Sequence, residues 1–286
     1  MTSGADMPGF VATAFVRACE LDVAARKPGN VSRASPGHGM NAGMFVASAA
    51  AAAPPLCARG RAVGERIEAA VRASLAAGGC NTNLGIVLLC APVAAACERW
   101  RPADGAAGLR AALRAVLEGL DVEDARAAYR AIALARPGGL GTVARHDVAE
   151  PARIGLREAM ALAAHRDRIA WQYGHAHADL FETGLPAFEA CAGDQERAMQ
   201  HVYLEFLAGA PDSHIVRKHG EAASHSVMNE ARPWRLRARA GEALDRDPAF
   251  AQWDASLKAR RLNPGTSADM SAGTAFLAGL CRLRME

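Results

Sequence analysis

The chain has 286 residues, enough to bury a sizeable core, and hydrophobic residues make up 51% of it while aromatic residues make up 5%. Because 33 Lys and Arg residues nearly balance 30 Asp and Glu residues, the formal charge of +3 offers no general attraction for nucleic acid, and any anion must be bound locally. The apolar content is mostly Ala, Leu and Val, and alanine combines the highest helix propensity with a small side chain. We therefore expect an all-α fold, one compact multi-helix bundle that forms a single domain over residues 1–286.

Cysteine spacing and hydropathy indicate the compartment. The seven cysteines form no C-x-x-C pair, so they predict neither a zinc site nor a disulfide framework, and they are typical of small core residues under reducing conditions. The N-terminus lacks a basic region followed by an apolar stretch, and the Ala-rich run 47–53 is too short to cross a bilayer. We expect a cytoplasmic protein with no membrane partner.

Helical periodicity recurs along most of the chain. Apolar residues at spacings of three and four predict helices over 11–25, 63–75 and 109–120, and Asp121 is the predicted N-cap of a helix that ends before Pro137. Further predicted helices span 155–181, 195–208, 233–245, 248–260 and 268–282. Alternating β-branched residues joined to hairpin turns are missing from the sequence, so no sheet is expected. Helices rich in small residues pack equally well between subunits, which leaves a homo-oligomer open.

Five polar segments interrupt the helices, and the first begins at Arg26. Pro28-Gly29 ends a helix and frees backbone amides, while neighbouring basic residues supply cations, and this combination holds phosphate oxygens. The alternative is a helix C-terminus whose basic residues complement the dipole, followed by a Gly-rich connection through 36–41. The candidate phosphate ligands in this segment are Lys27, Gly29, Asn30 and Arg33.

The second segment, Gly78 to Gly85, leads directly into an apolar run. A helix N-terminus after a glycine-rich loop binds anions through its free amides and its dipole, although the Gly-Lys-Ser/Thr ending of a Walker loop is missing here. Its polar residues could simply cap the helix, but three in a row exceed what capping requires. The candidate ligands are Asn81, Thr82, Asn83 and Gly85.

The third segment, 136–147, is predicted to be a flexible Gly-rich bend. Beyond it, Asp167 lies in a predicted helix, where it either joins a solvated face or points inward. His175 and His177 lie two positions apart, which places them on different faces of a helix and makes them a poor metal pair.

The fourth segment, Asp212 to Gly220, is predicted to start a helix with Asp212 as its N-cap. Cations follow from 214 to 219, near a helix N-terminus where the dipole disfavours them. An anionic ligand would explain that placement, and solvated surface charge is the alternative. The candidate ligands are Ser213, His214, Arg217 and Lys218.

The fifth segment runs from Asn263 to Asp269 and precedes a helix of small residues. Asn-Pro-Gly is a turn signal, and Ser267 is the predicted N-cap. Asp269 either complements the helix dipole or binds Mg²⁺ through water. The candidate ligands are Asn263, Gly265, Ser267 and Asp269.

In this order, the segments resemble the triphosphoribosyl-dephospho-CoA synthase family. That family shows Lys-Pro-Gly near its start, Asn-Thr-x-x-Gly opening an apolar helix, Asp-Ser/Thr followed by basic residues and Gly, and a final Asn-Pro-Gly-x-Ser-Ala-Asp. The corresponding segments here are Lys27 to Gly29, Asn81 to Gly85, Asp212 to Gly220 and Asn263 to Asp269. The resemblance spans almost the whole chain.

The resemblance implies an all-helical transferase of cofactor biosynthesis that moves the triphosphoribosyl group of ATP to the ribose 2′-hydroxyl of dephospho-CoA, or of a related acceptor, and releases adenine. A glycosyl transfer through an oxocarbenium-like centre needs a carboxylate to deprotonate the acceptor or steady the cation, and cations or Mg²⁺ to hold the triphosphate. By this resemblance Asp212 and Asp269 are the candidates for the base or the Mg²⁺ ligand. The implied phosphate ligands are Lys27, Arg33, Arg217 and Lys218, with Asn81, Thr82 and Asn83 positioning the sugar or phosphate.

The chain departs from the family pattern at two places. The family carries Asp residues about ten positions after Lys-Pro-Gly, where segment 36–41 has no carboxylate, and its common His-Lys pair is Asn83-Leu84 here. These departures indicate a divergent branch, which we associate with methanopterin-type cofactor synthesis in methylotrophs. Two alternatives stay open: an ATP-dependent enzyme of that cofactor synthesis that uses the fold for a different reaction, and a non-catalytic nucleotide-binding helical scaffold.

Overall fold

A computed structural model describes residues 7–139, 147–191 and 193–282, and these form helices and loops without a β-strand. The all-α prediction is therefore confirmed. The α-helices are α1 (Met7–Ala24), α2 (Ala42–Leu56), α3 (Val63–Gly78), α4 (Leu84–Ala96), α5 (Gly105–Glu118), α6 (Val122–Ala135), α7 (Leu156–Ala163), α8 (Arg168–Gly174), α9 (Leu185–Glu189), α10 (Gln195–Gly209), α11 (Ser213–His219), α12 (Glu221–Arg239), α13 (Pro248–Ala259) and α14 (Gly265–Cys281). Three short 3-10 or π segments are η1 (Pro102–Asp104), η2 (Leu180–Gly184) and η3 (Leu244–Arg246).

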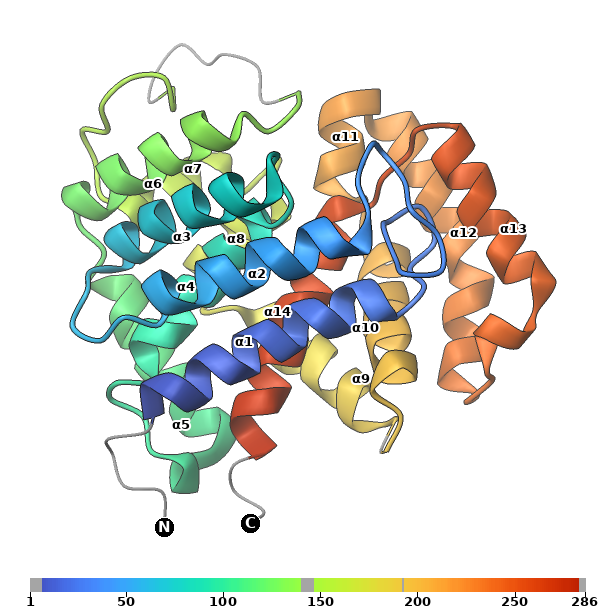
Figure 1. The fold of residues 1–286 in the computed structure, drawn as a ribbon, viewed down its shortest axis with the longest axis horizontal. Helices are drawn as coiled ribbons and strands as arrows, with labels where there is room; N and C mark the ends of the chain where they lie inside the picture. The colour runs from blue at the N-terminus through green and yellow to red at the C-terminus, as the bar shows by residue number, and fades with distance from the viewer. Residues whose placement is uncertain (1–6, 140–146, 192, 283–286) are drawn as a thin grey trace.

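The last helix, α14, runs through the middle of the molecule, with α3 to α7 to its left and α10 to α13 to its right in Figure 1. It contacts α1, α4, α5, α9, α10 and α11. Its sequence is mostly small and apolar, and 14 of its 17 residues are buried. A helix that is apolar on all sides belongs in a core, so segments from both halves of the chain pack around α14.

Small residues let the helices around α14 approach closely. Helix α4 has 12 buried residues out of 13 and packs against α14. A Cβ atom at Gly184 would lie 2.3 Å from Thr274 Oγ1, and one at Gly273 would lie 3.0 Å from Leu180 Cδ2. The alanine- and glycine-rich composition is thus a consequence of close helix packing, since larger side chains would not fit at these crossings.

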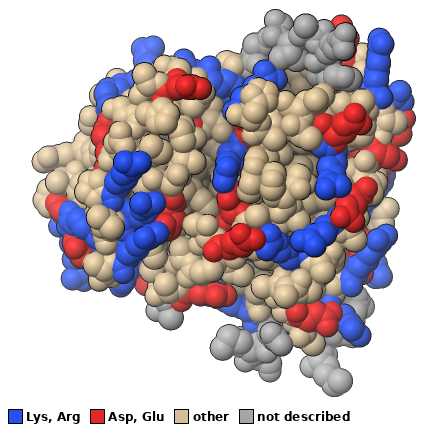
Figure 2. Space-filling model, turned by 180° about the vertical axis from the view of Figure 1, so that it is seen from behind, with Lys and Arg blue, Asp and Glu red and all other residues tan. Residues whose placement is uncertain are grey.

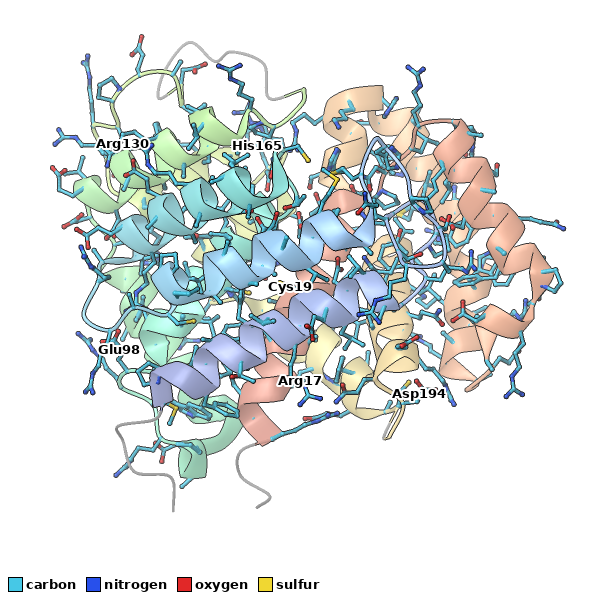
Figure 3. All side chains as sticks on the ribbon, viewed as in Figure 1. Arg17, Cys19, Glu98, Arg130, His165 and Asp194 are labelled. Atoms are coloured by element: carbon cyan, nitrogen blue, oxygen red, sulfur yellow. The ribbon has the colours of Figure 1, made fainter. Side chains whose placement is uncertain are left out.

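Many charged side chains lie at the outside of this arrangement, and five of the seven thiols are buried within it. Figure 3 shows Arg17, Glu98, Arg130 and Asp194 at the periphery and Cys19 near the centre. All seven cysteines are free thiols, and burial raises the pKa of the Cys19 thiol well above its ordinary value. Among the helices described, none is long and apolar enough to span a membrane.

The helix predicted over 155–181 is wrong, because the chain breaks into α7, α8 and η2. Asp167 starts a new helix: its Oδ1 accepts hydrogen bonds from the amides of Ile169 at 2.9 Å and Ala170 at 3.1 Å. After α8, Ala176 and His177 take left-handed backbone conformations with φ of 46° and 50°. Apolar periodicity continues through both breaks, which is why it predicted one helix.

The helix predicted over 233–245 is also wrong in its bounds. Helix α12 starts at Glu221, passes through Pro233 and ends at Arg239. Proline at the start of a helix is common, which favoured a start at Pro233. Packing of Val227, Met228 and Ala231 against the rest of the protein instead carries the helix through the proline. Of the predicted bend at 136–147, residues 140–146 lie outside the described part of the chain.

Replacing Gly64 with alanine should destabilise the fold by about 1–3 kcal/mol. A Cβ atom there would lie 2.5 Å from the backbone of Asp124, where α3 crosses α6, and the Gly64 amide donates to Asp124 Oδ1 at 2.7 Å. Gly209→Ala is the matched control, because a Cβ at Gly209 would meet nothing within 4 Å. Urea unfolding of both variants checks this, and equal stabilities would contradict the crossing geometry.

Candidate active site

The turn that contains Lys27 packs directly on the turn before α14. Asn30 Nδ2 donates a hydrogen bond to Asn263 Oδ1 at 2.8 Å. Gly29 has a left-handed φ of 83°, and a Cβ there would lie 2.8 Å from both Leu262 O and Pro264 Cδ. Only glycine therefore allows this approach. Two of the predicted segments, more than 200 residues apart in sequence, thus form one surface.

Asp212 joins α11 to α14. Its Oδ1 accepts from the amides of His214 at 2.9 Å and Ile215 at 3.2 Å, which confirms Asp212 as the N-cap of α11. Its Oδ2 accepts from the amide and from the hydroxyl of Ser267, both at 2.8 Å. Ser267 is therefore not the N-cap that we predicted: α14 begins earlier, at Gly265, and Ser267 lies in its first turn. Burial raises the pKa of Asp212, and its four hydrogen-bond donors oppose that rise.

Asp269 follows Ser267 by two residues in α14 and faces the start of α4. A Cβ at Gly85 would lie 2.1 Å from Asp269 Oδ2, so the glycine leaves room for this carboxylate. The Asp269 side chain forms no hydrogen bond or ion pair with any residue in the described part of the chain. Burial, followed by the nearby charges of Asp22 and Asp212, raises the pKa of Asp269 well above its ordinary value, while Lys27 opposes the rise. Asp269 is thus a carboxylate with free oxygens and increased basicity.

The polar residues before α4 divide into one cap and a set of unpartnered groups. Asn81 Oδ1 accepts from the amide of Leu84 at 3.2 Å, which is ordinary capping. Asn83 Oδ1 accepts from Ser74 Oγ at 2.6 Å, but its Nδ2 atom has no partner in the described part of the chain. Thr82 Oγ1 is likewise buried without a partner. Buried polar atoms are nearly always hydrogen-bonded, so these atoms point to a ligand at the start of α4.

Helix α11 links these segments to α8 and to the third polar segment. Ser213 Oγ accepts from the amide of Arg168 at 2.8 Å, and Arg217 Nη1 lies 3.3 Å from Asp167 Oδ2. Arg217 Nε also donates to Gly138 O at 3.1 Å. The described part of all five polar segments therefore meets around the N-terminal end of α14.

The cations of α11 lie at its end, which corrects their predicted placement near its N-terminus. The helix has only seven residues, so Arg217, Lys218 and His219 occupy its last turn, where the dipole favours cations. Within it, the His214 ring packs on Gly265, and a Cβ there would lie 2.3 Å from His214 Nδ1. Burial, together with Lys218 and Arg217, lowers the pKa of His214 to about 3.

A hollow of about 640 Å³ opens where the end of α11 meets the first polar segment and the end of α13. We call it the loop pocket, and it is lined by His38, Gly39, Lys218, His219, Lys258 and Arg261. Lys218 and Arg261 are exposed, and their side chains form no hydrogen bond or ion pair with described residues. His219 Nε2 donates to Arg261 O at 3.1 Å and so joins the two helix ends. The described residues that line the pocket include no acidic side chain, so its local charge attracts anions.

Charge elsewhere on the surface is mixed. Figure 2 shows Lys and Arg interspersed with Asp and Glu on the face opposite to that of Figure 1, with a hollow running between two parts of the molecule. The local concentration of cations in the loop pocket therefore stands out from a nearly neutral background.

Comparisons with known proteins bear on this arrangement. The model of the ATP:dephospho-CoA triphosphoribosyl transferase family matches residues 8–285. The chain belongs to this family. A crystal structure from Archaeoglobus fulgidus, assigned as a triphosphoribosyl-dephospho-CoA synthase, has the same fold, with a TM-score of 0.63, 24% sequence identity, and coverage of 82% of this chain and 97% of that one. A search of curated proteins found no match.

As a member of the triphosphoribosyl transferase family, the protein is an enzyme, with ATP and dephospho-CoA as the substrates of the family. Its reaction therefore requires a site for two phosphorylated nucleotides. The arrangement around α14 offers an unpartnered carboxylate, unpartnered amide and hydroxyl groups, and a cation-lined hollow.

The structure gives Lys27 a different environment from the one expected of a phosphate ligand. Its side chain is fully buried, and its Nζ lies 2.7 Å from Asp22 Oδ1 and donates to Asn30 Oδ1 at 2.8 Å. The ammonium group is thus neutralised inside the protein and orders the turn. Arg33 has an exposed side chain that none of the site contacts involve.

Sequence reasoning missed several residues of this region. Asp22 and Asp254 are buried carboxylates within helices, and Asp254 Oδ1 accepts from the Gly29 amide at 2.8 Å. Lys258 donates to Ser35 O at 2.8 Å. The sequence offers one signal for such residues, which is an acidic residue at an otherwise apolar helical position, as at Asp22. It does not identify their partners, because Asp254 and Gly29 lie far apart in sequence.

Asp269→Asn should stabilise the protein at neutral pH, whereas Asp212→Asn should destabilise it. Because the folded-state pKa of Asp269 is raised, its ionisation costs stability as the pH rises above the ordinary value of 3.8, and an amide removes that cost. We expect the melting temperature of Asp269→Asn to rise by roughly 2–4 °C at pH 7.5. That gain should vanish below pH 3.8.

Asp212→Asn should lose about 2 kcal/mol, because an amide nitrogen cannot accept from the Ser267 donors. Thermal unfolding of the two variants between pH 4 and pH 8 measures both effects. Equal destabilisation of both variants would contradict the distinction between a free and a fully bonded carboxylate.

Proposed function

We propose that Asp269 is the general base of the family reaction and that Asp212 positions it. The observation that carries this is the difference between the two carboxylates: four donors occupy Asp212, whereas Asp269 has no partner among the described residues. A general base works best when its pKa lies near the working pH, and burial beside other carboxylates raises the pKa of Asp269 in that direction.

The chemistry is one glycosyl transfer. The bond between C1′ of the ATP ribose and the adenine nitrogen breaks, and adenine leaves with the bonding electrons. The 2′-hydroxyl oxygen of the acceptor forms a bond to the same carbon, its proton passes to Asp269, and the departing adenine takes up one proton. The positive charge that develops at C1′ is stabilised by the ionised carboxylate.

The loop pocket is the site proposed for the triphosphate. Lys218 and Arg261 form no hydrogen bond or ion pair with described residues, and His38 and His219 add ring nitrogens at the same rim. Lys258 is held by Ser35 and Asp254 and supplies a fixed charge behind them. Thr82 and Asn83, with their unpartnered atoms, are proposed to bind the sugar or phosphate at the start of α4.

Mg²⁺ fits this arrangement through Asp269. Among described residues, no group of three or more His, Cys, Asp or Glu side chains could hold a metal ion by itself. Mg²⁺ bound to nucleotides, however, needs only one or two carboxylates in addition to phosphate oxygens and water. When bound, it would neutralise triphosphate charge, and Asp269 is the carboxylate free to hold it as the alternative to serving as the base, because coordination to Mg²⁺ lowers the basicity of a carboxylate.

The two departures from the family pattern support a divergent branch with a changed site. Segment 36–41, which lacks the family's carboxylates, contributes His38 to the loop pocket, and His38 Nε2 donates to Gly29 O at 2.8 Å. We propose that the branch serves methanopterin-type cofactor synthesis, with dephospho-CoA or a related acceptor as its second substrate.

The packing of segments from both halves of the chain on α14 supports a single domain over residues 1–286.

Incubation with ATP and dephospho-CoA should release free adenine only when both are present. Chromatography of the products measures this, and Asp269→Asn should lower kcat by about 10²–10⁴-fold, since its base is lost. Release of ADP or AMP in place of adenine would favour a different reaction in methanopterin-type cofactor assembly. Nucleotide binding without turnover, unchanged in Asp269→Asn, would indicate a non-catalytic scaffold.

Lys218→Ala and Arg261→Ala should each raise the KM for ATP about tenfold, because each removes a charged hydrogen-bond donor from the triphosphate. Arg99→Ala is the matched control, since Arg99 is exposed and lies outside the loop pocket. Initial rates at varied ATP concentration test this. An unchanged KM in both pocket variants would remove the loop pocket from the proposal.

A further inference from the structure

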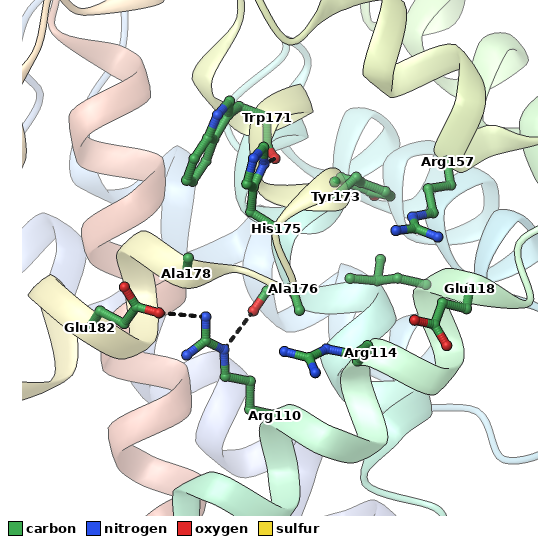
Figure 4. A pocket seen from close by; sticks show the side chains of 12 residues that line it. Arg110, Arg114, Glu118, Arg157, Trp171, Tyr173, His175, Ala176, Ala178 and Glu182 are labelled. Atoms are coloured by element: carbon green, nitrogen blue, oxygen red, sulfur yellow. Dashed lines mark hydrogen bonds and ion pairs between the residues drawn. The ribbon is translucent and has the colours of Figure 1, made fainter.

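A second hollow, of about 510 Å³, lies among α5, α7, α8 and η2. We call it the arginine pocket, and Figure 4 shows its side chains. The residues that matter here are Arg110, Arg114, Glu118, Arg157, Trp171 and His175. None of them belongs to the five polar segments around α14.

Two of its arginines are free to bind a ligand. Arg110 is occupied, because its Nη2 donates to Glu182 Oε1 at 2.7 Å and its Nε donates to Ala176 O at 3.3 Å. Arg114 and Arg157 are exposed and have no hydrogen bond or ion pair within the described ranges. Figure 4 shows both guanidinium groups pointing into the hollow. Among the described lining residues, Glu118 is the single unpaired carboxylate beside them, so their unpaired charge is +1.

An aromatic stack forms another wall of the hollow. The rings of Trp171 and His175 lie 3.7 Å apart at an angle of 8°. The Arg168 guanidinium lies 4.1 Å from the Trp171 ring, and Asp179 holds it at 2.6 Å. His175 is exposed, and its Nδ1 donates to Trp171 O at 2.8 Å, so the ring is fixed where a planar base can stack on it.

The backbone beside the stack is strained. Ala176, which lines the hollow, and His177 both have left-handed φ values, a conformation that costs of order 1 kcal/mol per residue with a side chain. Arg110 holds this turn through Ala176 O. Strain of this kind persists at ligand sites, where it fixes the shape of a wall.

The arginine pocket is within nucleotide reach of Asp269. Helix α8 starts at Arg168, and a Cβ at Gly85, the residue that faces Asp269, would also lie 2.7 Å from Ile169 Cδ1. The same helix ends at the pocket, and its seven residues span roughly 10 Å at 1.5 Å per residue.

We propose that the arginine pocket binds a purine nucleotide diphosphate, with the base stacked on His175 and the diphosphate between Arg114 and Arg157. This rests on the proposed function, in which the loop pocket takes the triphosphate of ATP and a second nucleotide, the acceptor, needs its own subsite. Dephospho-CoA carries an adenine and a diphosphate, the two groups that the stack and the arginine pair recognise.

The test uses the double variant Arg114→Ala/Arg157→Ala, with Arg99→Ala/Arg232→Ala as the control that removes the same charge at exposed positions outside both pockets. Binding of dephospho-CoA alone is measured by calorimetry, and KM for each nucleotide is measured by adenine release. We expect the pocket variant to raise Kd and KM for dephospho-CoA at least tenfold with kcat changed less than twofold. Glu118→Gln should lower the Kd and the KM for dephospho-CoA about twofold, because it removes a carboxylate that repels the diphosphate.

A rise in the KM for ATP instead would still support a nucleotide diphosphate site but assign it to the donor. Unchanged constants for both nucleotides, or an equal effect in the control, would overturn the inference. If the wild type binds dephospho-CoA, and the pocket variant does not, but no adenine is released, the subsite stands and the proposed function fails.

Discussion

The architecture of the site depends on the hydrogen bonds between Asp212 and Ser267. One carboxylate caps α11 through its Oδ1 and holds the first turn of α14 through its Oδ2. These bonds fix the end of α14 relative to α11, and Asp269 lies on that same end. A buried carboxylate with four donors is stabilised in place, whereas losing any of them would leave a desolvated charge. The hydrogen bonds of Asp212 therefore set the position of Asp269.

Glycines let other segments pack closely around the end of α14 that Asp212 holds. Gly29 lets the Lys27 turn touch the backbone before α14, and Gly85 leaves space for Asp269 against α4. Lys27 and Asp22 neutralise each other inside the protein, so the turn carries no exposed cation of its own there. The cations available to a ligand come instead from the ends of α11 and α13, which border the loop pocket. In the proposed site, positioning and anion binding are thus separate tasks, assigned to different residues of neighbouring segments.

The short helix α8 runs from the end of α14 to the arginine pocket. Its start is held by Asp167 and Ser213 beside the α14 end, and its Trp171 stacks with His175, the residue after its last turn, at the arginine pocket. A reaction between two nucleotides needs two anion sites at a fixed separation, and a helix is a rigid spacer for that purpose. The left-handed residues after α8 end this spacer and turn the chain into η2.

The sequence by itself determined the all-α class, the approximate bounds of about half of the helices, the N-caps at Asp121 and Asp212, and the five polar segments, because these depend on residues close together in the chain. It misplaced the helices over 155–181 and 233–245 and the start of α14, since packing overrode local signals there. Only the tertiary structure decided that Lys27 is buried, that Asp269 rather than Asp212 is unpartnered, and that Lys258 and Arg261 join His38 in one hollow. The burial and pairing of a charge depend on groups brought together from opposite ends of the chain, and no spacing in the sequence encodes that meeting.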